Sequence, residues 1–122
     1  MRSRDEIGPP ARPPRRFRGL PRRRLLGVEV PVATTLRARL LGLAGLRRDH
    51  AGPGLLIPRC RSVHTFGMRF PIEVAFLDAA GRVLSRRRLP PCRVAGCRGA
   101  AAVLEVAASP SPPGGEIAAP GA

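Results

Sequence analysis

The sequence predicts a mainly β domain, a small β-barrel or β-sandwich of about five strands with one short helix near its N-terminal side. Three observations support this prediction. The apolar segments are short and rich in β-branched side chains, only one of them has helical spacing, and Gly, Pro or Asp separates them. The 122 residues suffice for one domain but not for two separate cores.

A strand and the helix come first. Residues 25–32 alternate in polarity and contain several valines, which predicts a strand that Pro31 limits to an edge or an end. Thr34 or Thr35 is suited to cap the helix, and Gly42 is suited to end it. The helical stripe has i, i+4, i+7 spacing and consists of Leu36, Leu40 and Leu43.

The later elements are strands. Residues 72–77 are apolar on both faces except for Glu73, as expected of a central strand. A tight turn follows at residues 78–81, with Asp first and Gly last, so residues 72–89 are predicted to form a β-hairpin. Residues 102–106 supply a last strand.

Charge and composition divide the chain into three parts. The net charge is +14, and all 22 basic residues are Arg, a pattern that GC-rich codon usage also produces. Residues 1–24 hold nine Arg, two acidic residues and five Pro, which predicts a disordered arm of net charge +7. Residues 109–122 are rich in Pro and Gly and are predicted to form a flexible tail, which leaves residues 25–108 as the folded domain.

Two cellular locations are weighed from the sequence. No apolar run reaches the ~18 residues of a membrane-spanning helix. Arg pairs near the N-terminus resemble a twin-arginine export signal, but Glu29 and Pro31 interrupt the apolar segment that follows. Three Cys without a clear signal peptide favour a cytoplasmic protein with reduced thiols.

Residues 59–84 carry a resemblance to a known family. They read RCRSVHTFGMRFPIEVAFLDAAGRVL and resemble the central motif of the uncharacterised prokaryotic family called domain of unknown function 192. Residues 99–106 are similar to the closing segment of that family. Its strand-then-helix opening is matched by residues 32–34, Arg39, Gly42 and Leu43. The resemblance covers about residues 25–108 and implies a small β-barrel or β-sandwich with one helix, without implying a function.

The sequence departs from this family in two places. Many members have Phe-Trp-Met where this chain has Phe66-Gly67-Met68, so a pocket walled by that Trp is not expected here. The Gly-Asp strand that ends many members is matched only in part, by Gly115-Glu116-Ile117.

His64 is the most chemically suggestive residue. On an extended strand Ser62, His64, Phe66 and Met68 share one face. This predicts a small ligand site with His64 as acid, base or donor. Its residues are Arg61, His64, Phe66, Met68, Arg69 and Glu73. The alternative is a core histidine that hydrogen-bonds a backbone carbonyl and fixes the loop.

No metal or cofactor is expected. Cys60, His64 and Met68 are spaced four apart, but an extended strand separates the first from the last by about 26 Å. Cys92 and Cys97 have four residues between them, which is looser than the usual zinc spacing. A nucleophilic site would need Ser62 beside His64 with a carboxylate such as Glu73 or Asp78, and no nucleophile elbow is present.

The sequence therefore favours a non-enzymatic domain that binds a small molecule or a protein partner. The alternative is a basic accessory protein that associates with nucleic acid without sequence preference. Its phosphate contacts would come from Arg15, Arg16, Arg22, Arg23 and Arg24 in the arm, together with Arg86, Arg87 and Arg88 in the hairpin. Against that alternative, the chain has four Phe and no Tyr or Trp, so a base-stacking platform is poorly supplied.

Overall fold

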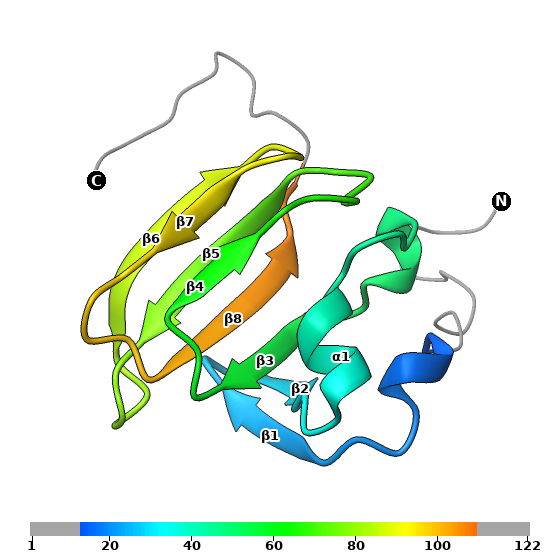
Figure 1. Ribbon diagram of the computed structural model, residues 1–122. Helices are drawn as coiled ribbons and strands as arrows, with labels where there is room; N and C mark the ends of the chain where they lie inside the picture. Colours follow the sequence, from blue (N-terminus) through cyan, green and yellow to red (C-terminus); the bar gives the residue numbers. More distant parts are fainter. Residues whose placement is uncertain (1–12, 110–122) are drawn as a thin grey trace, which may run out of the picture.

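The computed structural model describes residues 13–109, which contain eight strands in three sheets and one α-helix. The predicted mainly β class is confirmed. These residues form a sandwich-like arrangement rather than a closed barrel (Figure 1). The main sheet has the order β3-β8-β5-β6, with every neighbouring pair antiparallel. Its strands are β3 (Leu55–Pro58), β8 (Ala102–Ala107), β5 (Ile72–Leu77) and β6 (Val83–Leu89).

The central position of β5 explains its apolar sequence. The strand lies between β8 and β6, so both of its edges are paired. Ile72, Val74 and Phe76 point to one face of the sheet, which we call the inner face, and are at most 1% exposed. Ala75 and Leu77 point to the other, outer face and belong to a second apolar cluster. A strand buried on both faces matches the prediction for residues 72–77.

The predicted β5–β6 hairpin is confirmed, with its turn at residues 78–81. The Gly81 amide donates to the carbonyl of Asp78 at 2.9 Å. Oδ1 of Asp78 accepts from the amides of Ala80 and Arg82. These bonds explain why Asp and Gly stand at the two ends of the turn.

The inner face is covered by a two-stranded sheet and by helix α1 (Leu36–Leu41). The sheet pairs β4 (Ser62–His64) with β7 (Val94–Gly96) and lies in front of the main sheet in Figure 1. Val63 and Ala95 pack in the same cluster as Phe76. The connection after η2 (Arg48–His50) leads back into β3.

Helix α1 is capped as predicted but buries a different face. The side chain of Thr35 accepts from the Ala38 amide at 3.1 Å, and Gly42 ends the helix with φ +52°. Of the predicted stripe, Leu36 is 72% exposed and Leu40 61% exposed, whereas Leu43 is buried. Ala38 faces the core instead, because its small side chain permits close approach of the helix.

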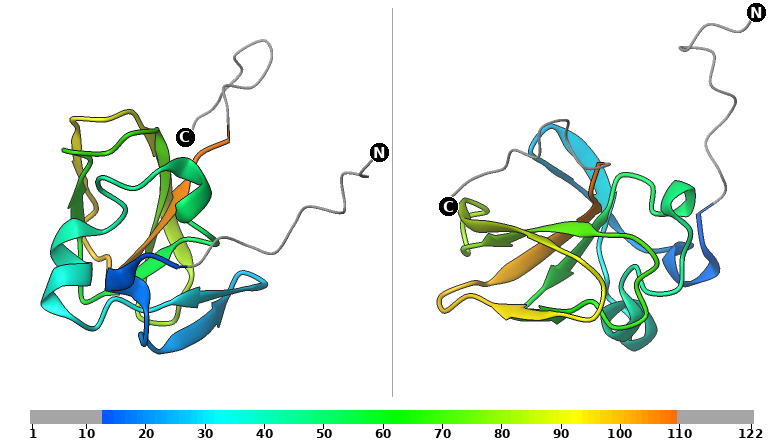
Figure 2. Two further views of the ribbon diagram at one scale, coloured as in Figure 1. Left: turned by 90° about the vertical axis from the view of Figure 1, so that its right-hand side faces the viewer. Right: turned by 90° about the horizontal axis from the view of Figure 1, so that it is seen from above.

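The outer face is partly covered by a hairpin of β1 (Arg22–Leu25) and β2 (Val28–Pro31), seen apart from α1 in both views of Figure 2. A single strand over residues 25–32 was therefore the wrong prediction. The chain reverses at Leu26 and Gly27, which both have positive φ as a type I′ turn requires. The turn was not predicted because Leu26 occupies a left-handed position at which Asn, Asp or Gly is the usual signal.

The predicted disordered arm is wrong for residues 13–24. A short 3-10 helix, η1 (Arg15–Phe17), places Phe17 in the core with 6% exposure, and β1 pairs with β2 along its whole length. The burial of the Phe17 ring and the backbone hydrogen bonds between β1 and β2 stabilise this segment despite its Arg- and Pro-rich composition. Residues 1–12 and 110–122 lie outside the described residues, and so do Gly115-Glu116-Ile117 and almost all of the predicted tail. No helix within residues 13–109 is long and apolar enough to span a membrane.

Candidate functional site

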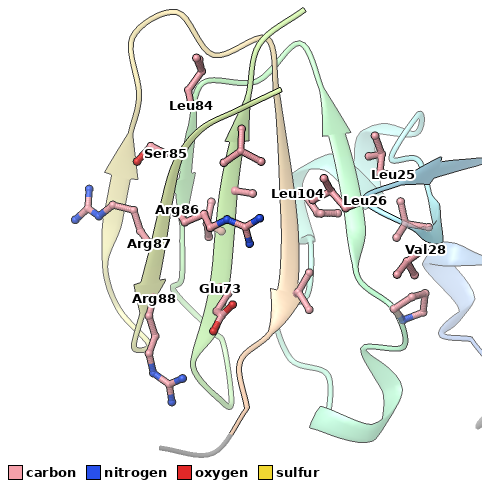
Figure 3. A pocket seen from close by; sticks show the side chains of 16 residues that line it. Leu25, Leu26, Val28, Glu73, Leu84, Ser85, Arg86, Arg87, Arg88 and Leu104 are labelled. Carbon is pink, nitrogen blue, oxygen red and sulfur yellow. The ribbon is translucent and has the colours of Figure 1, made fainter. Parts of the chain in front are cut away.

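A large groove, which we call the outer groove, lies on the outer face of the main sheet (Figure 3). Its volume is about 990 Å³. Ala75, Leu104 and Val106 form an apolar floor, because outward-facing residues of β5 and β8 stand opposite one another. The β1–β2 hairpin forms the facing wall through Leu25, Leu26, Val28 and Val30.

Strand β6 supplies the charged side of the outer groove. Arg86 stands opposite Ala75 and Arg88 opposite Glu73, so these side chains share the outer face. Arg87 stands opposite Val74 and starts from the inner side of this edge strand. Neither of the two ion pairs found among residues 13–109 involves Arg86, Arg88 or Glu73. The guanidinium groups of Arg86 and Arg88 are therefore available to an anion.

A second, much smaller hollow lies on the inner face, and we call it the Glu105 cavity. It has a volume of about 50 Å³ and lies between the end of α1, β3, β4 and β8. Ile57, Val63 and Met68 give it an apolar wall. Arg39, Cys60, Ser62, His64 and Glu105 are its polar lining residues.

Glu105 is the exceptional residue of this cavity. It is 3% exposed, and its Oε1 is buried without a hydrogen-bond partner among the described residues. Burial raises the pKa of Glu105 to about 7, and a backbone hydrogen bond with Leu43 opposes that rise. A Cβ atom at Gly42 would lie 2.7 Å from Oε1, so glycine at this helix end leaves room for the carboxyl group.

His64 lies beside this cavity at the end of β4. Its side chain is exposed, so the alternative of a core histidine is not what the structure contains. Nδ1 of His64 accepts from the Phe66 amide at 3.2 Å. The Phe66 ring stacks on the imidazole with centroids 5.4 Å apart.

The chain turns after His64, which changes the predicted spacing of Cys60 and Met68. Strand β4 has only three residues, and the Met68 amide donates to the carbonyl of Thr65. Cys60 and Met68 therefore line one small cavity instead of standing about 26 Å apart. Even so, no group of three or more His, Cys, Asp or Glu side chains in the described part of the chain is arranged to hold a metal ion. Cys60, Cys92 and Cys97 are free thiols.

The six residues predicted to form one ligand site do not come together. His64 and Met68 line the Glu105 cavity, whereas Glu73 lines the outer groove on the other face of the main sheet. Arg61, Phe66 and Arg69 line neither hollow. Ser62 and His64 both line the Glu105 cavity, but Glu73 and Asp78, the carboxylates predicted to complete a nucleophilic site, do not.

The arginines predicted to contact nucleic acid also separate. Arg22, Arg23 and Arg24 are exposed along β1. Arg16 is partly buried, and its guanidinium donates to the carbonyl of Ala44. They form no single flexible arm, because η1 and β1 belong to the folded domain.

The sequence did not single out Glu105 as a site residue, and it marked Arg86 and Arg88 only as phosphate contacts, not as part of a ligand groove. Glu105 is the one carboxylate in an apolar run that forms a strand buried on both faces, and that conflict was its detectable signal. Arg86 and Arg88 alternate with Arg87, so one face of β6 had to carry two of them. The groove itself depends on the unpredicted β1–β2 hairpin.

The comparisons with known proteins identify one family. No curated protein and no solved structure matches the chain. The family DUF192, described as "Uncharacterized ACR, COG1430", matches residues 15–111. The match includes η1 and β1. Each of the three stretches that carry the resemblance contributes to the lining of the Glu105 cavity: the opening segment through Arg39 and Gly42, the central motif through His64, and the closing segment through Glu105. The chain therefore belongs to the family DUF192.

Proposed function

We propose that this protein is a non-catalytic binding domain whose outer groove takes a small amphipathic anion, an apolar body with one carboxylate or phosphate group. The observation that carries this proposal is the apolar floor of the groove, flanked on one side by Arg86 and Arg88, which form no ion pair within residues 13–109. Ligand sites usually combine a mostly apolar lining with a few convergent polar groups.

The size and lining of the groove support a ligand of this class. Its volume of about 990 Å³ accommodates a molecule of drug or fatty-acid size. Leu26 and Val28 are about half exposed on the facing wall, so an apolar body would remove them from water. An anion would also be drawn to a chain of net charge +14.

Arg86 is the proposed anchor of the anionic group. Arg88 stands opposite Glu73, a cross-strand arrangement in which the two charges attract each other. Arg86 stands opposite Ala75 and has no acidic neighbour across the strand. Its planar guanidinium can bind a carboxylate or a phosphate through two parallel hydrogen bonds.

The experiment is a fluorescence titration with 1-anilinonaphthalene-8-sulfonate, which combines apolar rings with an anionic group. We expect saturable binding that decanoate displaces and decyltrimethylammonium does not. Arg86→Ala should weaken binding by about tenfold, because a charge-assisted hydrogen bond is lost. Arg98→Ala removes the same charge from an exposed site outside the groove and serves as the control.

Equal weakening in both variants would mean that only net charge attracts the probe, and it would overturn the proposal. Duplex DNA at low salt is the second competitor. Displacement by DNA but not by decanoate would favour the nucleic-acid alternative, with the exposed Arg22, Arg23 and Arg24 as phosphate contacts.

A further inference from the structure

The Glu105 cavity contains a carboxylate oxygen that no group in the described chain satisfies. Oε1 of Glu105 has essentially no contact with solvent and no hydrogen-bond donor. A buried acceptor without a partner costs about 1–3 kcal/mol, and a charged one costs more. Glu105 as a whole is only 3% exposed and lines a hollow, so its unsatisfied Oε1 indicates a missing donor.

The protein's own cations do not supply this donor. Arg39 lines the cavity, but its guanidinium donates to the carbonyls of Pro58 and Arg59. His64 and Cys60 are the other titratable residues of the lining, and neither forms a hydrogen bond with Oε1 of Glu105. The thiol of Cys60 donates to the carbonyl of Ser62, and β3 and β5 contribute no charged side chain to the cavity.

The shape of the cavity limits the donor to a small group. About 50 Å³ offers room for roughly three water-sized groups. The wall formed by Ile57, Val63 and Met68 is apolar and buried, which suits a methyl or methylene group. A quaternary ammonium has no N–H to donate, so it cannot satisfy this oxygen.

We propose that the Glu105 cavity is a binding site for a small primary amine, with the ammonium group donating to Oε1 of Glu105 and its alkyl carbon against the apolar wall. The ion pair would form away from water, where a charge-assisted hydrogen bond is strong. This site lies on the opposite face of the main sheet from the outer groove, so the two proposals stand or fall separately.

The test is a two-dimensional ¹H–¹⁵N NMR titration of the full chain with methylammonium chloride at pH 8. Tetramethylammonium chloride at the same ionic strength is the control salt. We expect saturable shifts at the amides of Gly42, Leu43 and Glu105 with methylammonium only, because these groups surround the carboxyl.

Glu105→Gln should weaken methylammonium binding at least about tenfold, because the charged acceptor is lost. Glu29→Gln removes an exposed carboxylate that lines neither hollow and should leave binding unchanged. In the unmodified chain, binding should be about tenfold weaker at pH 6 than at pH 8, since protons compete for a carboxylate whose pKa is about 7. This pH comparison tests the site even if the Gln variant does not fold.

Two results would overturn the proposal. The first is an equal response to methylammonium and tetramethylammonium, which would mean that the shifts report ionic strength alone. The second is undiminished methylammonium binding by a folded Glu105→Gln protein. Either result would leave an intramolecular partner, such as a reoriented Arg39 side chain, as the donor for Oε1 in solution.

Discussion

At the scale of single residues, Glu105 conflicts with its surroundings more than any other described residue. It stands opposite Leu55 on β3 and Val74 on β5, on the side of the sheet that holds the core. The amide of Leu43 compensates only part of its desolvation. An ionised carboxylate in such a place lowers stability at neutral pH, which suits the binding role proposed for it.

Replacement of Glu105 by Gln should flatten the pH dependence of stability. The pKa of this carboxyl rises from 4.5 to about 7 on folding, so between these values the native state binds more protons than the unfolded state. Stability therefore falls as pH rises from about 4.5 to 7, by about 3 kcal/mol in total. We expect Glu105→Gln to remove that fall, measured as the urea unfolding free energy at pH 5 and pH 8. An unchanged difference between the two pH values would contradict the assignment.

Thr65 shows how a single residue positions the cavity lining. It is fully buried, its hydroxyl donates to the carbonyl of Pro90 at 2.7 Å, and the Arg93 amide donates to it at the same distance. These bonds hold the turn that brings Met68 back to the cavity. The alternation of residues 62–68 predicted one long strand face instead of a turn. The turn left no local signal in the sequence, because the partners of Thr65 lie about 25 residues away along the chain.

At the scale of elements, local signals explain which parts of the fold sequence analysis could predict. The β5–β6 hairpin was predictable because apolar strands flank a turn whose Asp78 and Gly81 make the bonds that such turns need. Helix α1 was predictable from its Thr35 cap and from Gly42. The β1–β2 hairpin was not, because Leu occupies the first position of its turn.

Leu26 is therefore a site where stability can be gained. Its φ of +49° is strained for a β-turn leucine, whereas Asn accepts this conformation and favours type I′ turns. We expect Leu26→Asn to raise the unfolding free energy by about 0.5–1 kcal/mol, measured by urea denaturation, since the side chain is half exposed. Leu26→Val should destabilise the protein, because a β-branched side chain fits this conformation worst. A lower midpoint for the Asn variant would show that the groove contacts of Leu26 outweigh the relief of strain.

At the scale of the whole molecule, the two faces of one sheet carry two different hollows. The inner face holds the larger core and the Glu105 cavity, and the outer face holds the smaller core and the outer groove. Since β5 and β8 contribute alternate residues to both faces, a shift of their register by one residue would exchange the two linings. The bulge between Phe76 and Leu77 lies at the far end of β5 from Glu73 and leaves this register intact where the sites are.

The N-terminal boundary of the domain is the last expectation that the fold changes. Composition placed this boundary at residue 25, but Phe17 packs in the inner core and β1 pairs with β2 in the hairpin that walls the outer groove. A chain that begins at residue 25 loses both, whereas one that begins at residue 13 keeps every described contact. Loss of the Phe17 ring alone should cost about 3–5 kcal/mol. We therefore expect the shorter chain to unfold at a much lower temperature, or without cooperativity, in circular dichroism melts. Equal melting temperatures would show that residues 13–24 add nothing to the folded domain.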